Sequence, residues 1–278
     1  MNSVLRTQTN TSETATHLGK TITGYEPGEI SAKGCMLAEI LMPGIPLQPV
    51  IDQQYLDSKT MSRRPGMILK YLPVLYDEVT GKLLSGGAYL FETYDDAKDY
   101  VRWAGEEFMV GEPKVVFAKQ PAFEAFKGTA WKVVGAHSCL PIDEHSVTRF
   151  MRWRCKGTAD LEAKLQDFYP QLRDIAKDEN DVASIWLLYN PETASVALQT
   201  GFKKSEGPDV AGAKHTLEKA RELEGLEDFL SSLLGVAPEF DRTSLILTLW
   251  LPKSRSAGGA ELTVPYYPMV PDITHDHT

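Results

Sequence analysis

The order of the expected strands and helices constrains the fold most, because it runs β-α-β-β-α-β twice along the chain. Each run is that of a ferredoxin-like unit, an antiparallel sheet with both helices on one face. Hydrophobic periodicity gives strands at 36–41, 67–76, 82–92, 114–119, 130–136, 147–155, 183–189, 195–202 and 245–251, and helices at 47–59, 95–108, 213–234 and from Thr158 through Ile175. We therefore predict an α+β fold with one ferredoxin-like unit over 35–140 and a second over 141–253.

Two of these strands are apolar on both faces. Residues 185–189 read Ile-Trp-Leu-Leu-Tyr, and 245–251 read Leu-Ile-Leu-Thr-Leu-Trp-Leu. A strand that is wet on one side would alternate. We expect the two sheets to face each other and to close an α+β barrel within one chain. An apolar space between them would be a usual small-molecule site; the alternative is that the sheets pack tightly and leave no room.

Composition limits the kind of partner. The chain has 278 residues and a formal net charge of −9, which disfavours nucleic acid and anionic membranes as partners. No apolar run approaches the ~20 residues that span a bilayer, and the first 30 residues lack the apolar stretch of a secretory signal. Cys35, Cys139 and Cys155 lie too far apart to indicate a disulfide framework or a zinc site. We predict a cytoplasmic monomer or homodimer.

The two ends of the chain lack periodicity. Residues 1–34 are Thr-rich and polar, so we expect a flexible arm. In residues 254–278, Pro265, Pro268 and Pro271 exclude a helix or a central strand. Tyr266 and Tyr267 are too apolar for a free tail, so this arm should pack on the body of the protein.

Two segments resemble the third strand and second helix of the dimeric α+β-barrel superfamily. They are Gly86–Glu92 (GGAYLFE) and Asp95–Tyr100 (DDAKDY), and the outline extends over 37–134 with a weaker echo in 147–251. Within the superfamily the resemblance is to antibiotic-biosynthesis-type mono-oxygenases. It implies a barrel of two units and a small, often aromatic substrate. Because the superfamily includes cofactor-free mono-oxygenases, isomerases, cyclases and dehydratases as well as haem enzymes, the resemblance leaves the reaction open.

Candidate catalytic residues gather where the two units join. His137 ends one expected strand and His145 opens the next, so both can lie at the mouth of the space between the sheets. On alternation, His137 shares a face with Trp131 and Val133, and His145 shares one with Arg149. A histidine can take a proton near neutral pH, and a buried arginine can stabilise an enolate or a phenolate. The alternative is that His137 is a core residue and that Arg149 pairs with acidic residues.

Several further side chains could form the substrate site. The aromatic ones offer stacking surface or a hydroxyl, Arg152 offers an anion contact, and all of them could instead be ordinary core or surface residues. They are Tyr71, Tyr89, Trp131, Arg152, Tyr189 and Trp250.

The chain has no nucleotide-binding glycine motif, no P-loop and no serine-hydrolase elbow, and we expect neither a metal site nor a cofactor. These features favour a cofactor-independent enzyme that abstracts a proton from an apolar or aromatic small molecule, as a lyase, isomerase, cyclase or mono-oxygenase. A haem enzyme and a non-enzymatic small-molecule binding protein are the alternatives.

Overall fold

The computed structural model describes residues 16–17, 20–21, 27–43, 60, 64–77, 82–140, 145–156, 160–203, 210–251 and 262–265. Both predicted units are present, each with the strand order 4-1-3-2 of a ferredoxin-like sheet. The first unit consists of β4 (Gly34–Pro43), β5 (Met67–Asp77), β6 (Lys82–Phe91), α2 (Tyr94–Glu106) and β9 (Ala125–Ser138). The second consists of β10 (His145–Arg154), α3 (Leu161–Asp178), β11 (Val182–Asn190), β12 (Ser195–Lys203), α4 (Val210–Glu222), α5 (Gly225–Leu234) and β13 (Phe240–Leu251).

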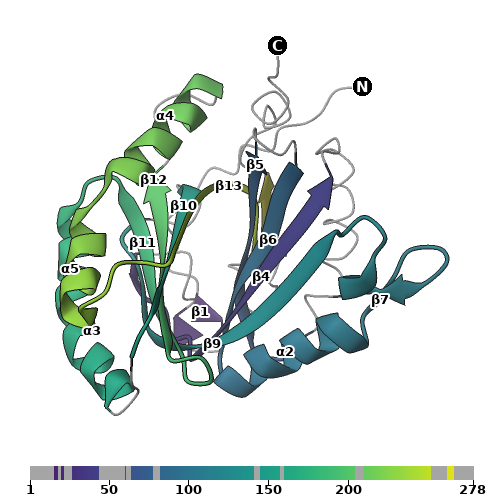
Figure 1. Ribbon diagram of the computed structural model, residues 1–278, viewed down its shortest axis with the longest axis horizontal. Helices are drawn as coiled ribbons and strands as arrows, with labels where there is room; N and C mark the ends of the chain where they lie inside the picture. Colours follow the sequence, from purple (N-terminus) through teal and green to yellow (C-terminus); the bar gives the residue numbers. More distant parts are fainter. Residues whose placement is uncertain are drawn as a thin grey trace.

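The two sheets join into one closed barrel. At one seam β11 pairs antiparallel with β9, and at the other β13 pairs antiparallel with β5. Within the second unit β13 also pairs with β10, which completes the ring of eight strands. Figure 1 shows the helices outside this ring, with α3 and α5 on one side and α2 on the other. Each unit therefore uses the other as the cover for its second sheet face, as the doubly apolar strands predict.

The helices cover the outer faces through amphipathic stripes. α2 begins after Thr93, whose side-chain oxygen accepts a hydrogen bond from the Asp96 N–H at 3.0 Å. Its buried face consists of Ala97, Tyr100, Trp103 and Ala104. α3 buries Leu161, Leu165, Tyr169, Leu172 and Ala176. The helix expected from Thr158 through Ile175 is therefore present in the described residues, where it begins at Leu161.

One expected helix is two helices. The predicted run 213–234 breaks between α4 and α5, after Leu223. The Leu223 carbonyl accepts a hydrogen bond from the buried Arg149 guanidinium at 2.7 Å, and Gly225 follows, which weakens a helix interior. Gly235 ends α5 in the left-handed conformation.

Other differences lie at short elements. The expected strand 114–119 is only β8 (Val115–Val116), which pairs with β7 (Met109–Val110) and continues into the 3-10 helix η1 (Phe117–Lys119). The ring of Phe117 packs on Phe108 at a centroid distance of 5.6 Å, which turns the chain inward under α2. The expected helix 47–59 lies outside the described residues.

The expected N-terminal arm meets the barrel before residue 34. The short strand β3 (Gly28–Glu29) pairs with the end of β9, and the side chains of Ile30 and Ala32 are buried. Strands β1 (Thr16–His17) and β2 (Lys20–Thr21) pair with each other in a separate sheet. Most of residues 1–26 lie outside the described part. In the expected C-terminal arm, β14 (Leu262–Pro265) pairs with β13.

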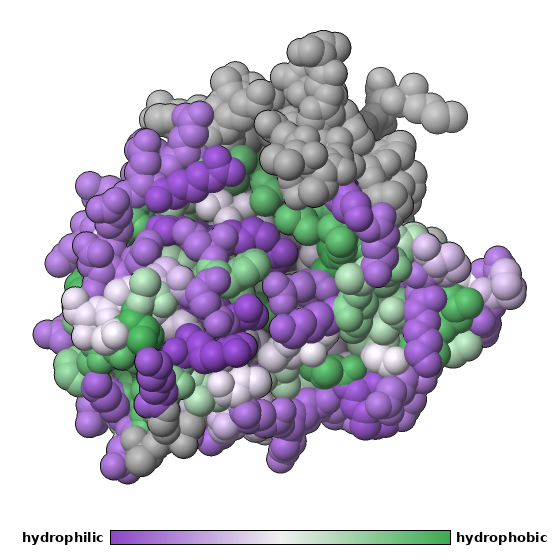
Figure 2. Space-filling view, in the orientation of Figure 1, coloured by the Kyte–Doolittle hydropathy of each residue, from purple (hydrophilic) through white to green (hydrophobic). Residues whose placement is uncertain are grey.

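The surface of the described residues is largely polar. Figure 2 shows hydrophilic residues over much of the middle of one face. Met109, on the β7–β8 hairpin, is the large hydrophobic residue that is exposed in the described ranges, at 45%. Within those ranges, none of the helices combines the length and apolar character needed to cross a bilayer.

Candidate functional site

The described residues of the barrel enclose a small polar cavity. Its volume is about 20 Å³, which is room for one water molecule. The barrel cavity is lined by Leu37, Ala38, Glu39, Pro73, Gly87, Ala88, Thr129, Trp131, Thr148, Phe150, Arg152, Gln199, Arg242 and Ser244. Charged groups surround this space, so the described part of the barrel interior lacks the apolar lining that we expected.

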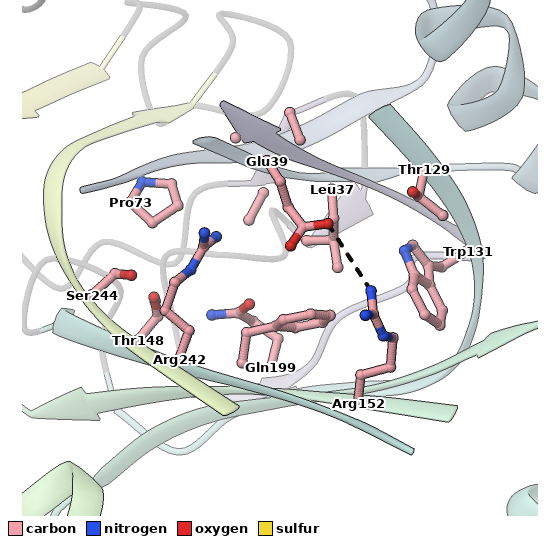
Figure 3. Close-up of a pocket in the computed structure, with 14 residues that line it drawn as sticks. Leu37, Glu39, Pro73, Thr129, Trp131, Thr148, Arg152, Gln199, Arg242 and Ser244 are labelled. Carbon is pink, nitrogen blue, oxygen red and sulfur yellow. Dashed lines mark ion pairs between the residues drawn. The ribbon is translucent and has the colours of Figure 1, made fainter. Parts of the chain in front are cut away.

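Charged and polar groups from both units converge on this cavity (Figure 3). Glu39 comes from β4 of the first unit, whereas Arg152 and Arg242 come from β10 and β13 of the second. The carboxylate of Glu39 lies 4.0 Å from the Arg152 guanidinium. Gln199 adds an amide from β12. The two facing sheets thus bring a carboxylate opposite two guanidinium groups.

Three hydrogen-bond donors in the cavity lack partners among the described residues. Arg242 makes no hydrogen bond or ion pair there, and its guanidinium lies 5.7 Å from the Phe240 ring. Trp131 Nε1 and Gln199 Nε2 are also buried without a hydrogen bond. The exposed fractions of these two residues are 2% and 4%. Buried donors without acceptors cost free energy, so the cavity is suited to a guest that supplies acceptor oxygens.

The pKa of Arg242 also indicates an unfavourable environment for its charge. Burial away from water lowers the pKa of its guanidinium from the usual value, and attraction to Glu39 offsets only part of that shift. Arginine nevertheless stays charged in proteins. An anion placed in the cavity would therefore relieve a charge that the described protein leaves without an ion pair.

A larger groove adjoins the cavity at one end of the barrel. Its volume is about 350 Å³, within the range of small-molecule sites. This mouth groove is lined by Lys98, Val101, Lys127, Gly128, Thr129, Ala130, Trp131, Arg152, Arg154, Asn190, Glu192, Thr193 and Ser195. Thr129, Trp131 and Arg152 line both spaces. The cavity and the groove are therefore neighbours that meet at these three side chains.

The structure places His137 outside the barrel. Leu187 pairs with Gly135 but Leu188 pairs with Val133, so Val134 is an extra residue in β9. This bulge shifts the alternation and turns His137 to the helix-covered face, away from Trp131 and Val133. There its Nδ1 lies 3.4 Å from a Glu29 carboxylate oxygen. The prediction that His137 shares a face with Trp131 is therefore wrong.

Arg149 also faces the helices, on the side of β10 opposite Arg152. Its guanidinium donates to both carboxylate oxygens of Asp241, at 3.0 and 2.7 Å, and to Glu227 at 2.7 Å. The fourth bond goes to the Leu223 carbonyl. The side chain is 5% exposed. Arg149 thus ties α4 and α5 to the barrel, which is the ion-pairing alternative named above.

The remaining predicted residues divide between the two faces. Trp131 and Arg152 line the cavity, and Tyr71 lies inside the ring with its ring stacked on Trp186 at 5.2 Å. Tyr89 packs on Tyr100 of α2 at 5.1 Å, outside the ring. Tyr189 lies on the face of β11 opposite Trp186. The side chains of His145 and Trp250 lie outside the described residues, although their backbones belong to β10 and β13.

Sequence reasoning missed three of the most telling cavity residues, Glu39, Gln199 and Arg242. A signal for Glu39 existed, since it is the one charged residue in the apolar run 36–41. Gln199 similarly interrupts the strand 195–202. Arg242 had no such signal, because the expected strand began at Leu245, whereas β13 begins at Phe240.

We expect His137 to affect stability rather than catalysis. Burial lowers the pKa of its imidazole, although Glu29 opposes the shift. The unfolded chain then binds the proton more tightly, so the contribution of neutral His137 is full above about pH 6.5 and is lost as the pH falls toward the folded pKa. Urea midpoints at pH 7.5 and 5.5 should fall less in His137→Gln than in the wild type. An unchanged fall in the variant would contradict this role.

The described cavity residues do not fit haem or a protein-bound metal. Neither the barrel cavity nor the mouth groove is lined by histidine or cysteine in the described part of the chain. In the same ranges, no three His, Cys, Asp or Glu side chains gather as a metal site would require.

Comparisons with known proteins bear on the fold. No protein-family model matches the chain, and no curated protein matches it in sequence. An anthrone oxidase-like protein of known structure superposes with a TM-score of 0.50 at 11% identity, over 81% of this chain and 96% of that one. The chain is a duplicated ferredoxin-like α+β barrel.

Two bacterial structures are similar to this α+β barrel to a lesser degree. A candidate monooxygenase from Fusobacterium nucleatum has a TM-score of 0.49 at 10% identity and covers 78% of this chain and 93% of its own. One from Lactobacillus acidophilus has a TM-score of 0.47 at 10% identity and covers 84% and 99%. The likeness to the anthrone oxidase-like protein concerns the fold, and the chemistry has to be argued from the cavity.

Proposed function

We propose that this protein is an enzyme that removes a proton from an enolisable aromatic small molecule and holds the resulting enolate oxygen in the barrel cavity. The observation that carries the proposal is a pair of buried donors without hydrogen-bond partners among the described residues, Trp131 Nε1 and Gln199 Nε2, beside the partly buried guanidinium of Arg242. Preorganised donors aimed at developing negative charge are the strongest single device for stabilising an enolate.

The volumes of the barrel cavity and the mouth groove indicate which part of the substrate each one holds. The cavity has room for one small group, so only the reacting oxygen fits there. The body of the substrate occupies the mouth groove, where the Trp131 indole offers an aromatic wall. This arrangement replaces the predicted chamber that would enclose the whole substrate.

Glu39 is the base that the described cavity provides. Its carboxylate takes a proton from the carbon next to the substrate carbonyl, and the electron pair of that C–H bond moves to the carbonyl oxygen. Arg242, with Arg152 beside it, then stabilises the enolate. The step needs no cofactor and is common to isomerases, lyases, cyclases and oxygenases that act through a carbanion.

This assignment moves the proton transfer from His137 to Glu39, because His137 lies behind the strand wall. His145 stays a prediction as a second proton-transfer group. A binding protein without turnover is the second candidate, and the same unpartnered donors favour it, since they would hold a ready-made anion equally well.

The test follows hydrogen exchange in 2-tetralone, an aromatic ketone with an acidic C–H bond. We expect the wild-type protein in D₂O to accelerate loss of the C1 proton signal well above the buffer rate, as measured by NMR. His137→Gln should exchange at the wild-type rate. Binding of 2-naphthoate without any acceleration of exchange would favour the binding protein, and failure of both would remove the proposal.

A further inference from the structure

We infer that the mouth groove recognises a second anionic group, so that the substrate is an aromatic acid whose far end carries a negative charge. This inference rests on the proposed function, because it places the reacting oxygen in the barrel cavity. It adds the chemical class of the part that stays outside. Four cationic side chains line the groove against one carboxylate, Glu192.

A chain of alternating charges connects the cavity to the groove. Lys127 lies 3.9 Å from Glu39, which lies 4.0 Å from Arg152. Arg152 donates to Glu239 at 2.9 Å, and Glu239 lies 3.4 Å from Arg154. This series of side chains therefore begins and ends with a cation and carries one excess positive charge, although the formal net charge of the protein is −9.

The two terminal cations are the ones open to a ligand. The side chains of Lys127 and Arg154 are 63% and 68% exposed, whereas Arg152 between them is 20% exposed. Within the described ranges, Lys127 and Arg154 each have one carboxylate neighbour, at 3.9 Å and 3.4 Å respectively, so neither pair is a close one. An anion in the groove can contact these cations without breaking a short ion pair.

The opposite wall of the groove is prebuilt. Asn190 is 3% exposed, and its amide donates to the Ala130 carbonyl at 3.1 Å. Its side-chain oxygen accepts from the N–H groups of Glu192 and Thr193 at 2.9 and 3.1 Å. These bonds fix the β11–β12 turn on β9, so a guest meets a formed groove at small conformational cost.

The buried indole of Trp131 links this groove to the cavity. It is 2% exposed, lines both spaces, and its Nε1 has no hydrogen-bond partner among the described residues. A flat ring along this wall would direct one end toward Arg242 and leave the other near the terminal cations. An aromatic compound with acidic groups at opposite ends matches that layout.

Calorimetric titration tests the inference with two probes that differ only at the far end, naphthalene-2,6-dicarboxylate and 6-hydroxymethyl-2-naphthoate. At low salt the wild type should bind the dicarboxylate about 10-fold more tightly, the gain expected of two partly exposed ion pairs. The gain should shrink with added salt because exposed charges are screened.

The variant Lys127→Met/Arg154→Met should lose most of this gain and bind the mono-acid as the wild type does. A matched control, Lys114→Met/Lys119→Met, removes two cations outside the groove and should keep the gain. Equal affinity of the wild type for both probes, or equal loss in both double variants, overturns the inference. If the wild type fails these binding tests but still catalyses hydrogen exchange in 2-tetralone, the proposed function stands. If it catalyses no exchange but still binds the dicarboxylate more tightly than the mono-acid, only the proton-transfer step is removed.

Discussion

Replacing Arg242 by methionine should lower the rate of 2-tetralone exchange about 10²- to 10³-fold, the usual effect of removing one oxyanion donor. The same change should leave the free energy of unfolding unchanged or raise it by up to about 2 kcal/mol, because it removes a buried charge without an ion pair among the described residues. Exchange by NMR and urea unfolding of the same preparation measure the two effects. Loss of activity with no loss of stability is the signature of a functional residue.

Arg149→Met is the matched control, since both residues are arginines of the second sheet, Arg149 buried and Arg242 partly buried. Arg149 has a complete set of partners in Asp241, Glu227 and the Leu223 carbonyl. Its loss should cost about 3 kcal/mol, at the low end for a broken buried pair because both carboxylates are partly exposed. If Arg242→Met is the destabilised variant and exchange survives in it, the assignment of the cavity as an oxyanion site is wrong.

Replacing Glu39 by glutamine should lower the exchange rate about 10²- to 10⁴-fold, the range for loss of a positioned general base. The amide keeps the size of the side chain, so the fold should be unaffected. Binding of 2-naphthoate should hold or strengthen, because a negative charge leaves the neighbourhood of Arg152 and Arg242. Calorimetry and NMR exchange separate these two expectations.

Glu239→Gln is the control for Glu39. Glu239 pairs with the same Arg152, at 2.9 Å, but does not line the barrel cavity. This variant should keep exchange within a few-fold of the wild type. Comparable losses in both variants would mean that the charge chain, rather than a base at Glu39, controls the reaction.

The architecture was readable from the sequence because its signals are local and mutually consistent. The strand–helix order defines two units, and the strands at 185–189 and 245–251 are apolar on both faces. Such strands need a cover on each side, and the second sheet is the cover that the chain itself supplies. The closed ring of β9–β11 and β5–β13 contacts follows from those requirements.

The site was less predictable because a single inserted residue decides which way a side chain points. The bulge at Val134 turns His137 outward, and the local sign of it is Gly135, which is a weak signal because a glycine within a strand can also mark a close backbone approach. Arg149 and Arg152 lie on opposite faces as the alternation predicts, yet their roles depend on partners 74 or more positions away. Long-range ion pairing of this kind leaves no spacing pattern.

The lining of the barrel interior differs from the expected apolar wall in the part that the structure describes. An eight-stranded ring has an interior that its own side chains can fill or that can hold one small ligand. Tyr71, Trp131 and Trp186 occupy that interior, and they belong to the aromatic class from which a substrate wall was expected. Aromatic side chains that point into a barrel therefore indicate a filled interior as readily as a ligand-binding site.

Joining both halves of the ring in one polypeptide removes a restriction that identical subunits would impose. A dimer of identical chains related by a two-fold axis contains every inward residue twice. A carboxylate that faces two guanidinium groups would therefore always occur together with a second, symmetry-related set. Here Glu39 belongs to one half and Arg152 and Arg242 to the other. The two halves can therefore differ in sequence, with one supplying the carboxylate and the other the guanidinium groups. The barrel has one asymmetric charged site in place of two equivalent ones.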